Sequence, residues 1–258
     1  MALSPDYRTY TGATRAAETA AVLDAGLRAY MLRVYNWMAS GLVLTGIVAY
    51  VISSTPLLSA FYPLVMTASG RMVPAPTLLG WIAIFSPVAF VLVLNVGVNK
   101  FSITTVQALY WAFCLAMGAS MAMLLEMYTS ESVARVFFIT AGTFAAMSIF
   151  GYTTNRDLTK FGSFLIMGMF GLFLAMLVNM FLGSSGMQFV ISIVGVLVFT
   201  GLAAYDTQRI KASFVQFAYA YGPGEAAKRS VYDALGLYLN FVNLFQFLLM
   251  LMGNRNSN

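Results

Sequence analysis

The chain has 258 residues, of which 60% are hydrophobic and 9% are charged, with a formal net charge of +5. A soluble domain carries roughly 25% charged residues, so this composition argues against a soluble enzyme or a nucleic-acid-binding protein, and its hydrophobicity excludes a disordered chain. The absence of histidine and the single cysteine, Cys114, exclude histidine-based triads, histidine-ligated metals and an intrachain disulfide.

The chain begins with a polar segment and continues with apolar stretches. Residues 1–26 contain Asp6, Glu18 and Asp24 and lack an uninterrupted apolar core, so they predict a cytoplasmic segment rather than a signal peptide. A short interfacial helix is expected over residues 16–34. The remainder, residues 27–258, predicts an all-α integral membrane protein with a seven-transmembrane-helix bundle, because each of seven stretches approaches the roughly 20 apolar residues that the bilayer core requires. These stretches are 34–54, 78–98, 104–126, 133–153, 161–182, 187–208 and 231–252.

Two connections are expected to be long and the others short. Prolines predict an irregular loop over residues 55–77, and the Tyr-Gly-Pro-Gly sequence at 221–224 predicts a break in a loop over residues 209–230. With a cytoplasmic N-terminus, 11 of the 14 Lys and Arg residues fall in cytoplasmic segments and 3 on the other side. This bias follows the positive-inside rule and, with seven spans, predicts a C-terminus outside the cytoplasm.

Few polar groups lie at membrane depth, where each is costly unless it is paired, hydrated or neutralised. Asp206 lies near the end of the sixth span, either as an interfacial carboxylate paired with Arg209 or Lys211, or as a group facing the bundle interior. In the interior it would be a proton sensor or an oxygen ligand for a hard cation such as Ca²⁺. The other candidates for a polar lining are Asn240, Asp233, Asn243, Asn179 and Asn95.

Three segments, in this order, resemble motifs of one family. The sequence FGYTTNRDL at 150–158 is similar to a turn of the bacterial branch of the Bax inhibitor family, also called the transmembrane Bax-inhibitor-motif proteins. Residues 201–211 resemble its intramembrane YDTQ segment, and residues 234–245 resemble its LYLDFINLF-type last helix. The resemblance covers most of the chain from Arg28 to Arg255.

The resemblance implies a bundle with the last helix central and a pH-sensitive Ca²⁺ leak in a bacterial inner membrane, together with a role in stress response. In bacterial relatives two aspartates form a pH-sensing pair, whose positions match Asp206 and Asn240 here. A basic residue near the end of the second span can latch the first aspartate, and Lys100 matches it by position.

This chain departs from the family pattern because Asn240 stands where the second aspartate is expected. An Asp–Asn pair lacks the repulsion that makes two carboxylates share a proton. We therefore expect Asp206 to titrate as a single site and the pH gating to be weakened, shifted or lost. Asp233 lies seven residues before Asn240 on the same helix face and is a second-choice substitute.

Three functions remain in competition. The first is the leak, with transient Ca²⁺ binding at Asp206 and no resident cofactor. The second is a non-conducting protein of the bilayer that modulates a partner such as a membrane protease through residues 1–26 and 209–230. The third, an intramembrane aspartyl protease, is disfavoured because Asn240 replaces the second aspartate and no GxGD motif occurs, so we expect no enzyme.

Overall fold

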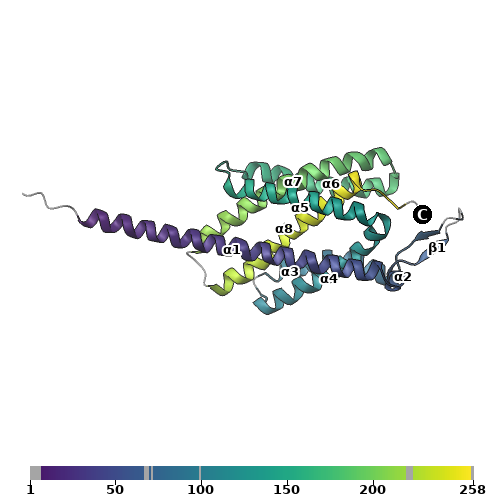
Figure 1. Cartoon of the computed structure of the whole chain (residues 1–258), viewed down its shortest axis with the longest axis horizontal. Helices are drawn as coiled ribbons and strands as arrows, with labels where there is room; N and C mark the ends of the chain where they lie inside the picture. Colours follow the sequence, from purple (N-terminus) through teal and green to yellow (C-terminus); the bar gives the residue numbers. More distant parts are fainter. Residues whose placement is uncertain (1–6, 67–69, 71, 99, 219–222, 257–258) are drawn as a thin grey trace, which may run out of the picture.

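The structure is a computed structural model that describes residues 7–66, 70, 72–98, 100–218 and 223–256 (Figure 1). Residues 1–6 of the predicted N-terminal segment, and residues 221–222 of the predicted break, lie outside this described part. Within it, seven helices are long and apolar enough to cross a membrane. They are α1 (Tyr7–Ser53), α3 (Leu78–Val96), α4 (Ile103–Met127), α5 (Ser130–Thr153), α6 (Thr159–Leu182), α7 (Ser185–Ala218) and α8 (Pro223–Met252).

The seven predicted spans are therefore confirmed, each by one of these helices. The first helix is longer than predicted, because the expected interfacial helix and the first span are one continuous α1. Its membrane-spanning candidate begins at Val22.

The prediction of an irregular loop over residues 55–77 is wrong. This connection contains a short helix α2 (Leu57–Phe61) and an antiparallel hairpin of β1 (Leu64–Met66) and β2 (Met72–Pro74), with Val65 opposite Val73. Val65 and Val73, a residue type that favours strands, face each other across the hairpin. Gly70 between the strands has a positive φ of 76°, which suits a turn. Thr77 then accepts a hydrogen bond from the Gly80 amide and caps α3.

The prediction of a long loop over residues 209–230 is also wrong. Helix α7 continues to Ala218, and α8 begins at Pro223. The extension is amphipathic: Ile210 is buried, and the Phe214 ring lies 5.0 Å from that of Tyr30 on α1. The basic residues in this segment do not end the helix, because long cationic side chains can reach water from a helix that has left the bilayer core.

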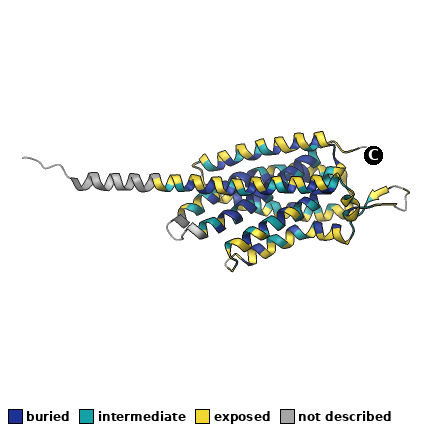
Figure 2. Ribbon diagram, turned by 60° about the horizontal axis from the view of Figure 1, so that its bottom comes forward, coloured by how far each residue is buried: buried dark blue, intermediate teal, exposed yellow. Residues whose placement is uncertain are grey.

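Helix α8 is the centre of the bundle, as the resemblance implied. It contacts α1, α4, α5 and α7 and has the largest buried share of the seven spans. Helix α6 packs on α7, and α3 packs on α4, at the periphery. Buried residues gather in the middle of the molecule and apolar exposed ones cover its outer faces (Figure 2), as expected for a surface that faces lipid.

The two ends of the bundle differ in charge. The end where α3, α5 and α7 finish carries most of the described basic residues, and we call it the basic end. The basic residues there are Arg28, Arg33, Lys100, Arg156, Lys160, Arg209, Lys211, Lys228 and Arg229. Arg135 and Arg255 lie at the opposite end, which we call the far end. There the chain after α8 pairs with the α4–α5 turn through a bridge between Tyr128 and Arg255.

Candidate functional site: a buried carboxylate between α7 and α8

Asp206 is the centre of a buried polar cluster between α7 and α8. Its residue surface is 8% exposed. The Asn240 amide Nδ2 on α8 donates to Asp206 Oδ2 at 2.5 Å, and Arg209 Nη2 lies 3.0 Å from Asp206 Oδ1. The carboxylate thus faces the bundle interior, and each of its two oxygens has a polar partner.

The placement of Asp206 combines features of both interpretations from the sequence. The carboxylate is paired with Arg209, as expected for an interfacial group, but it is buried rather than open to water. Arg209 reaches from the buried carboxylate to the protein surface, because its side chain is 50% exposed while that of Asp206 is 11% exposed. Gly236 on α8 lies beside the guanidinium, since a Cβ placed there would be in ordinary van der Waals contact with Arg209 Nη2, at 3.8 Å.

A second carboxylate lies nearby on α8. Asp233 accepts a hydrogen bond of 2.6 Å from the Tyr30 hydroxyl of α1. It is half-buried and lies within electrostatic range of Asp206, Arg209 and Arg229. Arg209 therefore acts on both carboxylates, and the cluster joins α1, α7 and α8 at the basic end.

The first two family-like motifs pack against each other beside this cluster. Gln208 accepts from the Leu158 amide at 2.8 Å through Oε1 and donates to the Arg156 carbonyl at 2.8 Å through Nε2. Lys211 donates to the Tyr152 carbonyl at 2.8 Å. These contacts hold the end of α7 against the α5–α6 turn.

Close backbone packing brings the same two segments together. Gly151 lies directly against the carbonyl of Ala204, where any Cβ would clash. In the turn itself Asp157 accepts from the Thr159 amide at 2.9 Å. Hydrogen bonds from the side chain and backbone of Thr159 hold the pKa of Asp157 below its usual range. Asp157 is thus a turn residue of the exposed rim.

The structure does not bring Lys100 to the cluster. Lys100 is exposed in the turn between α3 and α4, and its backbone amide bonds to the Gly97 carbonyl. Among the described residues, the basic group paired with Asp206 is Arg209. A latch formed by Lys100 stays a prediction about another conformation.

The remaining asparagines are also apart from Asp206. Asn95 is exposed and donates to Val91 O of its own helix at 2.8 Å. Asn179 lies at the far end, where its side-chain oxygen accepts from the Ser184 amide. Asn243 is half-buried and donates to Leu239 O at 2.8 Å. Of the amides predicted to line a polar path, Asn240 is the one that contacts Asp206.

The donor set does not fit a tight metal site. In the described part of the chain, no three Cys, Asp or Glu side chains gather into a group that could hold a metal ion. Ca²⁺ prefers six to eight oxygen ligands, whereas Asp206 has an amide and a guanidinium as neighbours. The arrangement can neutralise a buried carboxylate, and it can offer that carboxylate to a cation only if Arg209 moves away.

Sequence reasoning missed Gln208 and Tyr30. Gln208 follows Asp206 by two residues, so it points to another helix face, towards the α5–α6 turn. The Tyr-Asp-Thr sequence before it could have indicated a role for Gln208 only if α7 had been known to continue beyond residue 208. Tyr30 lies before the predicted first span, and its contact with Asp233 depends on how α1 crosses α8.

Comparisons with known proteins agree with this architecture. Residues 27–257 match the family model described as Inhibitor of apoptosis-promoting Bax1. An uncharacterized protein of Caulobacter vibrioides is 43% identical over 91% of this chain and 92% of the relative. The inner membrane protein YbhL of Escherichia coli K12 is 39% identical over 90% of this chain and 94% of the relative. With the match spanning all seven helices, this chain belongs to the Bax inhibitor family of multi-pass membrane proteins.

Proposed function

We propose that this protein is a Ca²⁺ leak pathway in the bacterial inner membrane, with Asp206 as the sensing carboxylate and Arg209 as the group that closes it. The observation that carries the proposal is the buried Asp206 side chain, held at once by Asn240 and Arg209. An ionisable group inside a membrane protein is costly and marks an ion or proton pathway more often than a packing site.

Arg209 is suited to act as a movable counter-ion. A buried carboxylate without a partner is expensive, so Asp206 stays neutralised while Arg209 is in place. Because half of the Arg209 side chain is already exposed, moving the guanidinium itself to water costs little, and the main cost is the Asp206 carboxylate that it leaves unpaired. The exposed carboxylate would then attract a cation, and weak ligation by Asp206 and the Asn240 oxygen suits passage rather than storage.

Asn240 sets the expected pH response. Its amide stabilises the ionised form of Asp206 and brings no second negative charge. A leak with this pair should depend less steeply on pH than one with two carboxylates that share a proton. Asp233 does not take over this role directly, because its carboxylate is bonded to Tyr30.

We place the basic end, with the N-terminus, in the cytoplasm. The basic residues gathered at this end follow the positive-inside rule. The C-terminal residues after α8 then lie on the periplasmic side. The name of the YbhL relative supports the inner membrane as the location.

The test is Ca²⁺ flux into vesicles that hold the purified protein and a Ca²⁺ dye, measured from mildly acidic to mildly alkaline pH. We expect Asp206→Asn to lower the flux, Arg209→Gln to raise it several-fold, and Asn240→Asp to make it steeper with pH. Arg156→Gln, the same substitution in the exposed turn at the same end, should leave the flux unchanged. Wild-type and Arg209→Gln vesicles that both behave like empty ones would overturn the proposal.

A second candidate is a non-conducting protein that modulates a membrane partner. Helix α1 has 47 residues, more than twice the roughly 20 that a span needs, so it extends beyond the bilayer and offers a contact surface. If this candidate holds, deletion of residues 1–26 should abolish capture of a membrane-protein partner. The leak of the first proposal should survive the same deletion. If the deletion removes both Ca²⁺ flux and partner capture, residues 1–26 are not a separate partner-binding segment.

A further inference from the structure

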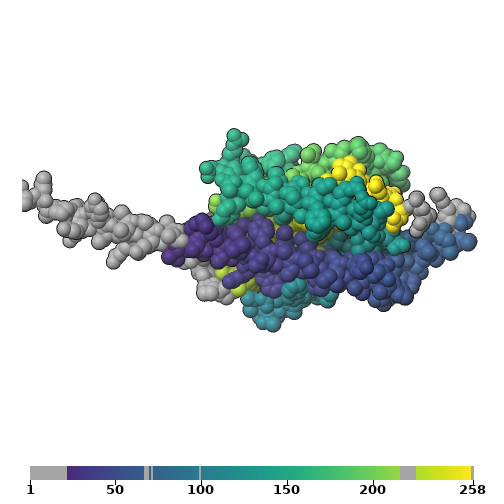
Figure 3. All heavy atoms as spheres, in the orientation of Figure 1, coloured from purple at the N-terminus to yellow at the C-terminus, as the bar shows by residue number. Residues whose placement is uncertain are grey.

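A lateral groove runs along the membrane-facing side between α1 and α5, which lie on the same face in the space-filling view (Figure 3). Helix α1 packs on α4, α7 and α8, and α5 packs on α7 and α8. Three hollows of about 690, 660 and 570 Å³ follow one another along the groove, each lined by both α1 and α5. We call this feature the α1–α5 groove.

The basic-end hollow has polar groups suited to an acidic headgroup. Arg28 and Lys211 line it, with Asp24 as the one carboxylate. Arg28 pairs with Asp24 at 3.2 Å on the surface, where both side chains are largely exposed and such pairs hold weakly. Arg28 is therefore free to turn to a stronger anion.

Ser148 provides an independent indication of a ligand in this hollow. Its residue surface is 6% exposed, and its hydroxyl has no hydrogen-bond partner. It lines the same hollow as Arg28 and Lys211. A buried hydroxyl without a partner is unfavourable, and rotation of the Ser148 side chain towards the hollow would let a ligand oxygen satisfy it.

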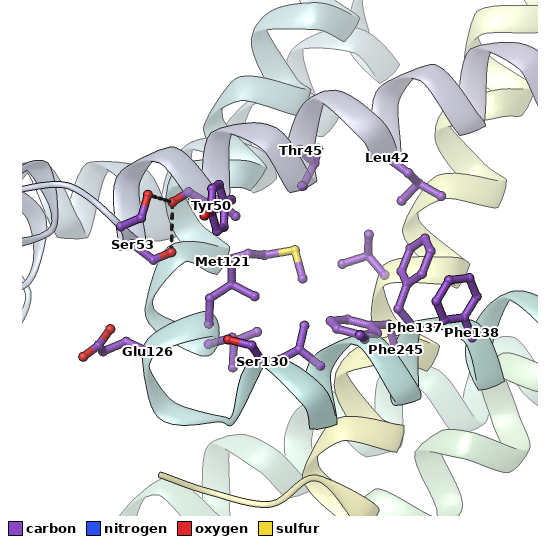
Figure 4. Close-up of a pocket in the computed structure, with 18 of the residues that line it drawn as sticks. Leu42, Thr45, Tyr50, Ser53, Met121, Glu126, Ser130, Phe137, Phe138 and Phe245 are labelled. Carbon is purple, nitrogen blue, oxygen red and sulfur yellow. Dashed lines mark hydrogen bonds between the residues drawn. The ribbon is translucent and has the colours of Figure 1, made fainter. Parts of the chain in front are cut away.

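Beyond Ser148 the groove is apolar for most of the membrane thickness. The middle hollow is lined by residues such as Met38, Leu42, Phe144 and Phe241. Figure 4 shows the far-end hollow, where Glu126 and Ser130 lie near the α4–α5 turn and Leu42, Phe137 and Phe245 lie on the side away from that turn. Residues 28 to 46 of α1 alone follow about 27 Å of the groove, against a bilayer core of about 30 Å.

We propose that the α1–α5 groove binds a phospholipid with an anionic headgroup. The phosphate lies at Arg28, Lys211 and Ser148, and one acyl chain runs past Leu42 and Phe241. An amphiphile with an acidic head and a long chain matches a groove that is basic at one end and apolar beyond it. A partner helix fits poorly, because one helical turn about 10 Å wide fills roughly 420 Å³. The middle hollow holds about 660 Å³ in total, although it follows α1 from Tyr35 to Tyr50, which is about four turns.

Gly46 allows the groove to be blocked without disturbing the bundle. It lines the middle and far-end hollows, and a Cβ added there would meet nothing within 4 Å. Gly171, exposed on α6, has the same open surroundings and lies outside the groove. Gly46→Phe and Gly171→Phe are therefore a matched test and control.

The experiment measures phospholipid retained per protein after purification in mild detergent, by extraction and mass spectrometry. We expect wild type and Gly171→Phe to retain phosphatidylglycerol or cardiolipin, and Gly46→Phe to retain several-fold less. Arg28→Gln and Ser148→Ala should reduce the preference for these lipids over phosphatidylethanolamine. Equal retention in the two glycine variants, or retention without any headgroup preference in wild type, would overturn the proposal. The groove does not include Asp206 or Arg209, so the result is independent of the proposed leak.

Discussion

The central helix α8 takes part in two buried polar clusters that differ in kind. Tyr238 faces α1 and α4, and its hydroxyl bonds to Thr45 at 2.7 Å, while Thr45 donates to the Cys114 carbonyl at 3.0 Å. Asn240, two residues further, points to the opposite side, to Asp206 on α7. The first cluster is neutral and closed, and the second is charged and contains a half-exposed arginine.

The difference separates a cluster that packs helices together from one to which our proposal assigns a function. In the neutral cluster each hydroxyl proton has an acceptor, because Thr45 donates to a carbonyl and Tyr238 in turn donates to Thr45. Such a cluster joins helices and has no alternative partners. In the charged cluster the Arg209 side chain is half exposed, and under the proposed function it exchanges Asp206 for water.

The largest effect is expected from breaking the charged pair. Arg209→Gln leaves Asp206 buried without a counter-ion and should lower the free energy of unfolding by about 2 kcal/mol, less than for a fully buried pair because Arg209 is half exposed. The same change in an Asp206→Asn background should cost little. Unfolding in mixed micelles measures both, and equal losses in the two backgrounds would contradict the pairing.

Next in size is the contact between α7 and the α5–α6 turn. Gln208→Ala removes the hydrogen bonds to Leu158 and Arg156 and should lower the free energy of unfolding by about 1 kcal/mol. Gln188→Ala, at the other end of the same helix, is the control. The same micelle unfolding assay applies, and no difference between the two variants would show that the turn is held by packing alone.

The neutral cluster should respond less. Tyr238→Phe removes the hydrogen bond to Thr45 and should cost about 0.6 kcal/mol, the average for such bonds in a membrane. Vesicle Ca²⁺ flux should be unchanged. If Tyr238→Phe raises the flux as much as Arg209→Gln, the distinction between the two clusters fails.

The smallest effect concerns the exposed turn. Asp157 has a lowered pKa, so its contribution to stability is present above the pKa of the unfolded chain and is lost as the pH falls through the folded pKa. That window lies below about pH 4. Asp157→Asn should slightly lower the melting temperature at neutral pH and reduce the difference between neutral and acidic melting temperatures. If the neutral and acidic melting temperatures of the variant differ as much as those of wild type, the acid sensitivity arises from other groups.

Some contacts of the site could be predicted from the sequence and others could not. Asp206 and Asn240 were predicted to meet, on the strength of the family motifs, and they do. The choice of Arg209 over Lys211 could not be made, because the sixth span was predicted to end at residue 208. Once α7 continues, Arg209 at i+3 shares the face of Asp206, and Lys211 points towards Tyr152 instead.

The sequence by itself determined the number of spans, their order and the asymmetry of basic residues, because hydropathy and charge are local properties of the chain. Only the tertiary structure decided which polar groups meet. Asn95 and Asn240 look alike within apolar stretches, yet one is exposed at the periphery and the other is buried against Asp206. That outcome depends on how far each helix continues and on which face it turns to its neighbours, and packing between distant segments sets both.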